Sequence, residues 1–359
     1  MDRKMASVQK IVDLKHIEGA DKIEVATVLG WNVVVRKGLF KVGDLVIYCE
    51  PDSLIPFTPW SEFLFKNGRT GNFRLKTIRL RGQISQGLVL PLTVFGGTIQ
   101  DYYFKTSKGT YDIYSLYGSF SEGDDVSERL NITKYEPEMP ANLRGICKST
   151  FPQWIPKTDE TRIQSIPDIL QRQRGAWVYV TEKVDGCSMT VYYKDNEFGV
   201  CSRNMDLKET DDNQYWKTAR DLKLKERLEA FYKGQRRQIA LQGELCGPGI
   251  QGNKYNLTEH KFLIFNVYDI DKNKYANFEE FIIIVGALGL EPVPFDCKFV
   301  LAFDSVDAIV KFSKGNSNLN KDVMREGIVI RPVREEQDEK IGRFSFKVIN
   351  PEFLIKHGE

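Results

Sequence analysis

The sequence is poor in the residues that build metal and disulfide frameworks. Its 359 residues include three histidines and six cysteines, and no two cysteines form a Cys-x-x-Cys pair. This pattern argues against a zinc site and, at this length, against a disulfide scaffold. Reduced thiols are typical of the cytoplasm and the nucleus, so we expect a cytoplasmic or nuclear protein.

Long apolar segments, phosphate-loop glycine patterns and an excess of charge are missing as well. The N-terminal residues MDRKMASVQK contain no apolar core of signal-peptide length, and the longest apolar run, FIIIVGALGL (281–290), is too short to span a bilayer. We therefore expect no membrane partner. No GxxxxGK[ST] motif occurs, which argues against a P-loop nucleotide site. Lys and Arg number 51 against 49 Asp and Glu, so any nucleic-acid site must come from a local patch.

The first hundred residues predict a small β-barrel. IEVATVLGWNVVVRKG and GDLVIYCEP alternate apolar and polar residues and are rich in valine, and FRLKTIRLRG and QGLVLPL continue the pattern. Glycine or proline separates these strands. Five short strands of this kind favour an OB-fold, which we assign to residues 1–105. Residues 106–145 show little periodicity and are predicted to connect this domain to the next.

Residues 146–359 mix helices and strands. Helical spacing of apolar residues occurs at ETRIQSIPDILQRQ (160–173) and at WKTARDLKLKERLEAFYK (216–233). Strand patterns are more numerous: AWVYVTEKV, CSMTVYYKD, EFGVCSRN, QIALQGEL, KFLIFNVYDID, EGIVIRPV and RFSFKVIN. This ratio favours an α+β domain with two antiparallel sheets over a doubly wound fold.

One lysine, Lys183, stands between Glu182 and Asp185 in the strand-like stretch VYVTEKVDGCSMTVYY (178–193), shortly before Gly186. A lone K-x-D-G match is weak, because three fixed letters recur by chance. A salt-bridged surface lysine at a strand end explains the same letters. The sequence around it decides between the two interpretations.

Six further segments accompany this lysine in order: KTDETRIQ (157–164) upstream, then SRN (202–204), QGEL (242–245), FNVYD (265–269), EGIV (326–329) and SFKVINPEFLIK (345–356). The set resembles the covalent nucleotidyltransferase superfamily of polynucleotide ligases and capping enzymes. More narrowly, it is similar to ATP-dependent RNA ligases of the RNA ligase 2 type. The strand-rich N-terminal segment resembles the leader domain of RNA ligase family 5. The resemblance covers nearly the whole chain, and it implies an OB-fold β-barrel followed by a two-sheet antiparallel nucleotidyltransferase (ATP-grasp-like ligase) domain at residues 146–359.

The resemblance also implies a role for each residue of these segments. Lys183 would be the nucleophile that carries AMP, and Lys347 would contact the α-phosphate. Glu182 and Phe265 would contact adenine, and Gly186 would allow a close backbone turn under the nucleotide. Arg203 would contact ribose or an RNA 5′-phosphate, Glu244 would contact ribose or a metal-bound water, and Arg162 would contact the leaving phosphates. Mg²⁺ or Mn²⁺ would be held by Asp185, Glu244 and Glu326.

A nucleophilic lysine has to lose its proton. With a pKa near 10.4, only about one lysine in 2,500 is neutral at pH 7, and lowering that pKa to about 7 requires about 4–5 kcal/mol. A divalent cation repels the ammonium charge and can supply this energy. The acidic neighbours of Lys183 would work against it unless they hold such a cation, which is why we interpret them as metal and nucleoside ligands.

Several residues have a simpler structural interpretation. Phe265 could be an ordinary core residue, Arg203 a solvated turn residue and the Glu326-Gly327 pair a loop end. The last motif also departs from the family, because relatives often have Lys-x-Lys where this chain has Ser345-Phe346-Lys347. Lys356 is a candidate for the second cation.

A basic stretch in the N-terminal domain is the candidate RNA-binding segment. KNGRTGNFRLKTIRLRG (66–82) has six basic residues and no acidic one, and three phenylalanines, Phe63, Phe65 and Phe73, lie in it or just before it. The pairs Arg74/Lys76 and Arg79/Arg81 each lie two residues apart, so each pair can face one side of a strand. Such a face suits phosphate contacts and base stacking, although a solvated barrel face has the same composition.

We therefore expect an ATP-dependent RNA ligase that seals 3′-OH and 5′-phosphate ends through lysyl-AMP and RNA-adenylate intermediates. Its partner would be a nicked duplex or paired RNA ends, with the enzyme acting as a monomer. The alternatives are an mRNA capping guanylyltransferase, whose OB domain follows its catalytic domain, and a catalytically silent RNA-binding protein of the same fold.

Overall fold

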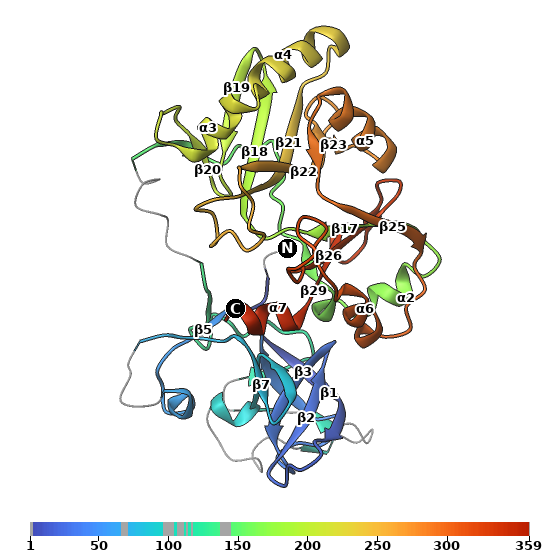
Figure 1. Ribbon diagram of the computed structural model, residues 1–359. Helices are drawn as coiled ribbons and strands as arrows, with labels where there is room; N and C mark the ends of the chain where they lie inside the picture. Colours follow the sequence, from blue (N-terminus) through green and yellow to red (C-terminus); the bar gives the residue numbers. More distant parts are fainter. Residues whose placement is uncertain are drawn as a thin grey trace. The chain divides into compact units, whose positions relative to one another are not determined.

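The computed structural model describes residues 3–65, 71–95, 104–105, 111–112, 114–115, 118–136 and 145–358. The chain divides into two compact units (Figure 1). The N-terminal unit comprises residues 1–137 with two returning segments, 164–167 and 354–359, and the second unit comprises 138–163 and 168–353. Much of the predicted connection, 106–145, lies outside the described residues. None of the helices in the described ranges is long and apolar enough to cross a membrane.

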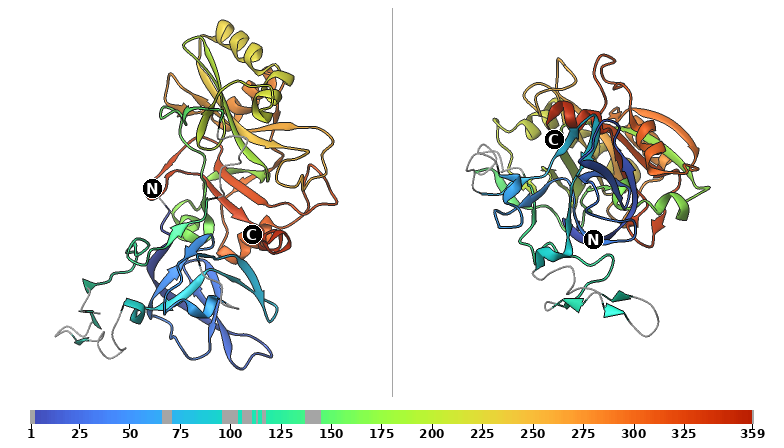
Figure 2. Two further views of the ribbon diagram at one scale, coloured as in Figure 1. Left: turned by 90° about the vertical axis from the view of Figure 1, so that its left-hand side faces the viewer. Right: turned by 90° about the horizontal axis from the view of Figure 1, so that it is seen from below.

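A curled antiparallel sheet forms the framework of the N-terminal unit (Figure 2). Its strand order is β3-β2-β1-β4-β9, with bounds Trp31–Arg36, Ile23–Val28, Ala6–His16, Leu45–Cys49 and Leu88–Pro91. The first half of β1 pairs with β4 and its second half with β2, with a register shift between Ile11 and Asp13. A bulged strand shared by two halves of a sheet is how small barrels turn a corner. The sheet agrees with the predicted OB-fold, although β1 itself was not predicted.

Shorter elements complete this unit. They are the sheet β14-β5-β6 (Thr133–Lys134, Ser53–Ile55, Phe73–Arg74), the hairpin β7-β8 (Thr77–Leu80, Gln83–Gln86), the hairpins β10-β11 and β12-β13 (Phe104–Lys105, Tyr111–Asp112, Tyr114–Ser115, Gly118–Ser119), and the 3₁₀ turns η1 (Glu62–Leu64) and η2 (Leu92–Phe95). Two apolar clusters fill the barrel. One surrounds the fully buried Trp31, and the other includes Ile47 and Ile55.

The larger sheet of the second unit has eight strands. Its order is β15-β20-β19-β18-β21-β22-β23, and β24 pairs with β22; the bounds are Cys147–Thr150, Met205–Leu207, Glu197–Cys201, Cys187–Lys194, Ile239–Cys246, Lys261–Asp269, Lys274–Tyr275 and Glu291–Pro292. On β21, Ile239, Leu241 and Leu245 belong to the main apolar core. Because side chains alternate along a strand, Gln242 and Glu244 point to the opposite face.

The smaller sheet has five strands in the order β16-β29-β26-β17-β25, with bounds Thr161–Arg162, Phe346–Ile349, Gly327–Pro332, Trp177–Lys183 and Phe295–Val300. Most pairs are antiparallel, whereas β16 runs parallel to β29. Lys183 lies opposite Gly327, and Val329 lies opposite Lys347. A hairpin, β27-β28 (Gln337–Asp338, Gly342–Arg343), follows β26.

Helices cover the larger sheet on the core side. The main apolar cluster joins its strands to α3 (Gln214–Asp221), α4 (Leu224–Gln235) and α5 (Phe278–Ala287), and Figure 1 shows these helices beside it. The predicted helix 216–233 is broken in two, because Lys223 adopts a left-handed conformation with φ 51° between α3 and α4.

The predicted helix over 160–173 was wrong. Residues 161–162 form β16, residues 163–165 form the turn η4 (Ile163–Ser165), and only α2 (Ile169–Arg172) is α-helical. Pro167 interrupts the segment, and the pairing with β29 outweighs its helical spacing of apolar residues. The remaining helices are α6 (Val306–Ser313) and α7 (Pro351–His357).

Candidate active site

Lys183 and Glu326 meet at the end of two neighbouring strands. Lys183 is the last residue of β17, and Glu326 directly precedes β26. The Lys183 Nζ donates a hydrogen bond of 2.7 Å to the Glu326 carboxylate, which is buried, whereas the lysine side chain is 27% exposed. Gly327 allows β26 to pair closely with β29, since a Cβ there would lie 2.3 Å from the Val348 carbonyl oxygen. The nucleophile predicted from KVDG and the carboxylate predicted from EGIV thus lie in one place.

A second carboxylate, Glu244, faces the same ammonium group. Burial raises the pKa of Glu244 to about 8, and repulsion from Glu326 and Asp185 adds to this effect although Lys183 opposes it. For Lys183 itself, burial alone would lower the pKa, but attraction to Glu326 and Glu244 prevails and raises it. In the absence of other ligands Lys183 is therefore a protonated, paired ammonium that cannot attack phosphorus.

Asp185 and Gly186 continue directly from β17. The Asp185 carboxylate forms an ion pair of 2.9 Å with Lys254, and its backbone N–H donates to the Tyr255 hydroxyl at 2.8 Å. A Cβ on Gly186 would lie 2.4 Å from the Leu245 carbonyl oxygen. Glycine is therefore required here for close passage over β21, which brings Glu244 to the site. Sequence reasoning did not identify Lys254; its only signal was a lysine in the polar loop GPGIQGNKYN (247–256).

Glu182 is held away from Lys183. Its carboxylate, almost completely buried, accepts hydrogen bonds from the Ser317 hydroxyl at 2.5 Å and from the Asn318 backbone N–H at 2.7 Å. Burial raises its pKa against these hydrogen bonds. Strand alternation directs Glu182 and Lys183 to opposite faces of β17. An adenine contact by Glu182, as predicted, would require an exchange of these partners.

Phe265 lies on β22 at the edge of a small apolar cluster. It is half-buried and packs with Val184, Tyr255 and Val293 among others. The guanidinium of Arg331 lies 5.9 Å from its ring centroid. The phenylalanine is thus partly a core residue, and its half-buried position leaves the predicted adenine stacking a matter for experiment.

Three of the predicted phosphate ligands come from neighbouring segments. Arg162 on β16 is in register with Lys347 on β29. Arg203 follows β19 in a turn and is 55% exposed. Asp159, which was not predicted, contacts both Lys347 and Arg203, at 3.3 and 3.1 Å. The structure therefore brings the cations of two motifs, Lys347 and Arg203, to one carboxylate.

Ser345 stands where relatives often have the first lysine of the last motif. This side chain is buried two residues before Lys347 and faces the Glu160–Arg331 pair. Lys356 lies in the last turn of α7, within the segment that groups with the N-terminal unit. Its assignment as the second cation of that motif stays a prediction.

The donor set suits a hydrated divalent cation better than a directly coordinated one. In the described part of the chain, no group of three or more His, Cys, Asp or Glu side chains is arranged to hold a metal ion. Instead Glu326 contacts the Lys183 ammonium, and the charges of Glu244 and Asp185 act on it as well. Carboxylate oxygens suit Mg²⁺ and Mn²⁺, and Mg²⁺ usually keeps several of its waters. The residues present therefore fit such an ion.

The basic stretch of the N-terminal unit does not form the predicted strand face. Residues 66–70 lie outside the described residues. Arg74 on β6 pairs with Asp52 at 2.7 Å and stacks on Tyr135, while Lys76 lies between strands and donates to the Gly358 carbonyl. Arg79 lies on β7, but Arg81 is in the hairpin turn with φ 49°. The prediction that each pair shares a strand face was wrong, because β6 ends at Arg74 and β7 ends at Leu80, so that Lys76 and Arg81 lie outside the strands.

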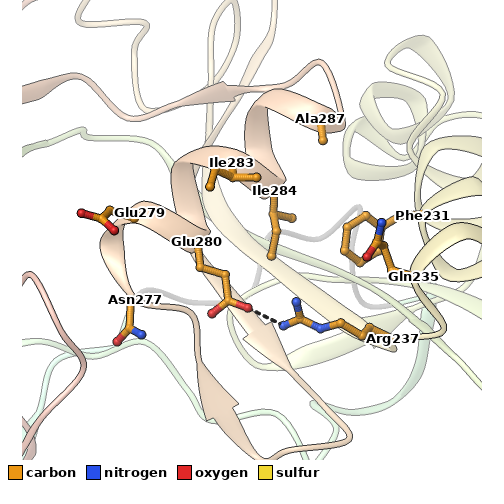
Figure 3. Close-up of a pocket in the computed structure, with 9 residues that line it drawn as sticks. All are labelled: Phe231, Gln235, Arg237, Asn277, Glu279, Glu280, Ile283, Ile284 and Ala287. Atoms are coloured by element: carbon orange, nitrogen blue, oxygen red, sulfur yellow. Dashed lines mark ion pairs between the residues drawn. The ribbon is translucent and has the colours of Figure 1, made fainter.

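A pocket of about 400 Å³ lies elsewhere in the second unit, between α4 and α5 (Figure 3). Ile283 and Ile284 of α5 and Phe231 of α4 line it, and Arg237 forms an ion pair with Glu280 at its edge. None of the motif residues is among the described residues that line this pocket. We therefore do not assign the chemistry predicted from the ordered motifs to this pocket.

Comparisons with known proteins agree with this geometry. Residues 177–349 match a family model described as RNA ligase, and residues 5–92 match an OB-fold domain. Among solved structures, a Naegleria gruberi RNA ligase mutant with AMP and Mn is 37% identical with a TM-score of 0.84, and the match covers 99% of both chains. A mutant with ATP and Mn gives 37% identity and 0.84 over 99% and 100% of the two chains. The same ligase with PPi is 36% identical with a TM-score of 0.82, and the match covers 99% of both chains.

The comparison with curated proteins finds no match. The fold and site define a ligase-type nucleotidyltransferase that carries an OB-fold domain at its N-terminus. The chain belongs to the RNA ligase family, which the full-length similarity at 37% identity establishes. The predicted family and fold class are confirmed.

Proposed function

We propose that this protein is an ATP-dependent RNA ligase that joins a 3′-OH end to a 5′-phosphate end through lysyl-AMP and RNA-adenylate intermediates. The observation that carries this proposal is the pairing of Lys183 Nζ with Glu326 at 2.7 Å, beside the buried carboxyl of Glu244. An amine at a strand end, among carboxylates that suit a divalent cation, can act as a nucleophile once it loses its proton. The family membership of the chain points to RNA as the substrate.

The first step takes place on Lys183. Its neutral amine attacks the α-phosphorus of ATP, an N–P bond forms, and the P–O bond to the β-phosphate breaks so that pyrophosphate leaves. The ammonium proton must be lost before this attack. Lys347 would place its positive charge on the α-phosphate, where negative charge develops, and Arg162 would contact the leaving phosphates.

The second step consumes the lysyl-AMP, and the third consumes the RNA-adenylate that the second step forms. A 5′-phosphate oxygen of the RNA attacks the same phosphorus and releases Lys183, and the 3′-OH then attacks the RNA phosphate and releases AMP. Arg203, exposed in its turn, is suited to contact ribose or the incoming 5′-phosphate. Phe265 would stack on the base, and Glu244 would contact the ribose or a metal-bound water.

Mg²⁺ or Mn²⁺ would be held by Asp185, Glu244 and Glu326. When bound, such an ion supplies positive charge that neutralises the three carboxylates and disfavours the ammonium form of Lys183. Asp185 is fixed for this role by Lys254 and by the Tyr255 hydroxyl.

Labelling with α-³²P nucleotides tests the proposal. Wild-type protein should become labelled from ATP and not from GTP, since GTP labelling would indicate a capping guanylyltransferase. Lys183→Ala should abolish labelling, and Lys183→Arg should fail too because a guanidinium stays protonated. Absence of labelling from either nucleotide, with metal present, would instead favour a silent RNA-binding protein.

Sealing of a nicked duplex then defines the substrate. We expect ligation of nicked RNA duplex or paired RNA ends, with the monomeric protein sufficient for activity. Strands of RNA and DNA on each side of the nick should be tested in turn, and sedimentation of the active species gives its oligomeric state.

A further inference from the structure

Asp159 holds two cations that the proposed mechanism assigns to substrate. One carboxylate oxygen lies 3.3 Å from Lys347 Nζ, and the other lies 3.1 Å from an Arg203 guanidinium nitrogen. A phosphate group also presents pairs of anionic oxygens to such donors. We propose that Asp159 is a positioning residue that stands in for a substrate phosphate between Lys347 and Arg203 until ATP binds. This inference rests on the proposed function and adds a residue to it.

Two contacts with the smaller sheet fix the segment that carries Asp159. Residues 161–162 pair with β29, with Arg162 in register with Lys347. The preceding residue, Glu160, accepts a hydrogen bond of 2.9 Å from Arg331, whose side chain is 2% exposed. Burial opposes ionisation of Glu160, but Arg331 and Arg343 prevail and lower its pKa. Breaking such a buried pair is costly, so the backbone at Asp159 stays in place.

Asp159 itself makes a much weaker contact than its neighbour. Its side chain is 48% exposed, and Arg203 is 55% exposed. The pair with Arg203 is exposed on both sides and contributes little to stability, because water and salt screen it, whereas Lys347 is only 18% exposed. A triphosphate carries more negative charge than one carboxylate and can therefore take over both cations, with Arg203 passing to ribose or the RNA 5′-phosphate in the later steps. Glu160 holds the segment in place, whereas the Asp159 side chain can be displaced from its cations. This combination is expected of a side chain that occupies a phosphate position only until the phosphate binds.

The contact has two consequences before substrate binds. It keeps two like charges, Lys347 and Arg203, oriented toward one point instead of repelling each other. It also competes with any anion for these cations, so that an anion without further contacts binds weakly. Removing the carboxylate charge should therefore increase the affinity of the site for phosphates.

The experiment compares Asp159→Asn with a matched control. Asp304→Asn removes the acid of another exposed pair of the same unit, Arg174–Asp304 at 3.1 Å, and none of the proposed ligands takes part in that pair. Binding of inorganic pyrophosphate is measured by calorimetry, and the ATP dependence of Lys183 adenylylation gives KM and kcat. Urea unfolding of each protein shows whether the fold is retained, and Asp159→Ser provides a second variant.

Both Asp159 variants should bind pyrophosphate more tightly, by up to about five-fold, which corresponds to the upper range for an exposed pair. The KM for ATP should fall similarly while kcat changes less than KM, and Asp304→Asn should match wild type. Unchanged or weaker pyrophosphate binding in both variants would overturn the proposal, as would a loss confined to kcat. If wild-type protein forms no lysyl-AMP, the proposed function fails, whereas the pyrophosphate comparison still decides the role of Asp159.

Discussion

Glu244 should make the stability of the protein fall with rising pH. Its carboxyl has a pKa of about 8 in the folded protein against 4.5 when exposed to water, because it is buried beside Glu326 and Asp185. The perturbation is Glu244→Gln, which keeps the size and polarity of the side chain and removes its ionisation. The comparison of the two proteins over pH then isolates the contribution of one proton.

The sign and size of the change in unfolding free energy follow from proton linkage. Below pH 4.5 the group is neutral in both the folded and unfolded states, so its contribution is fully present. Between pH 4.5 and about 8 the unfolded state releases the proton and the folded state keeps it, which costs about 1.4 kcal/mol per pH unit. From pH 5 to pH 8 the free energy of unfolding of wild type should therefore fall by up to about 4 kcal/mol relative to Glu244→Gln. Coupling to Lys183 makes this an upper limit.

Urea unfolding in metal-free buffer at pH 5, 6, 7 and 8 measures this difference. The control is Glu339→Gln, which removes an exposed carboxylate from the turn between β27 and β28. Mg²⁺ or Mn²⁺ should flatten the pH dependence of wild type, because a cation favours the ionised carboxylates. Parallel curves for wild type and Glu244→Gln, without metal, would refute the argument that burial keeps this carboxyl protonated.

Three further predictions concern the same framework. Glu326→Gln should lower the rate of lysine adenylylation from ATP more than tenfold while shifting the urea midpoint little; labelling at the wild-type rate over a metal titration would contradict its role. Gly186→Ala should cost about 1–3 kcal/mol in urea unfolding, since its Cβ would lie 2.4 Å from the Leu245 oxygen, whereas Gly234→Ala in α4, with open space around it, should add about 0.5–1 kcal/mol. Changing both Arg79 and Arg81 to Gln should reduce the slope of log affinity for RNA against log salt by up to about 2 and leave adenylylation unchanged; an unchanged slope would mean a solvated face.

The order of motifs in the sequence predicted the family, but single letters did not predict contacts. Lys183 and Glu326 are 143 residues apart, and only the register of β17 with β26 brings them together. Asp159 was part of a quoted motif, yet nothing in the sequence indicated that its carboxylate reaches both Lys347 and Arg203. Such contacts depend on how strands from distant segments pair, which periodicity does not reveal.

The errors in secondary structure have local causes. The long strand β1 was missed because its bulge near Ile11 interrupts the alternation of apolar and polar residues. The helix over 216–233 was predicted as continuous because Lys223, which ends it, is neither glycine nor proline. The basic face was overestimated because two-residue spacing places side chains on one face only within a strand, and β6 and β7 end before Lys76 and Arg81.

The site without substrate is a set of ion pairs that ATP and metal would exchange. Lys183 is held by Glu326, and Lys347 and Arg203 are held by Asp159. A divalent cation would take the place of the lysine charge among the carboxylates, and the triphosphate would take the place of the Asp159 carboxylate between the cations. The metal cation would replace the lysine cation, and the phosphate anion would replace the Asp159 anion. Each carboxylate and each cation of the site would therefore keep a partner of opposite charge. The same exchange would leave Lys183 without its partner carboxylate, and this would make it the group that loses its proton and attacks.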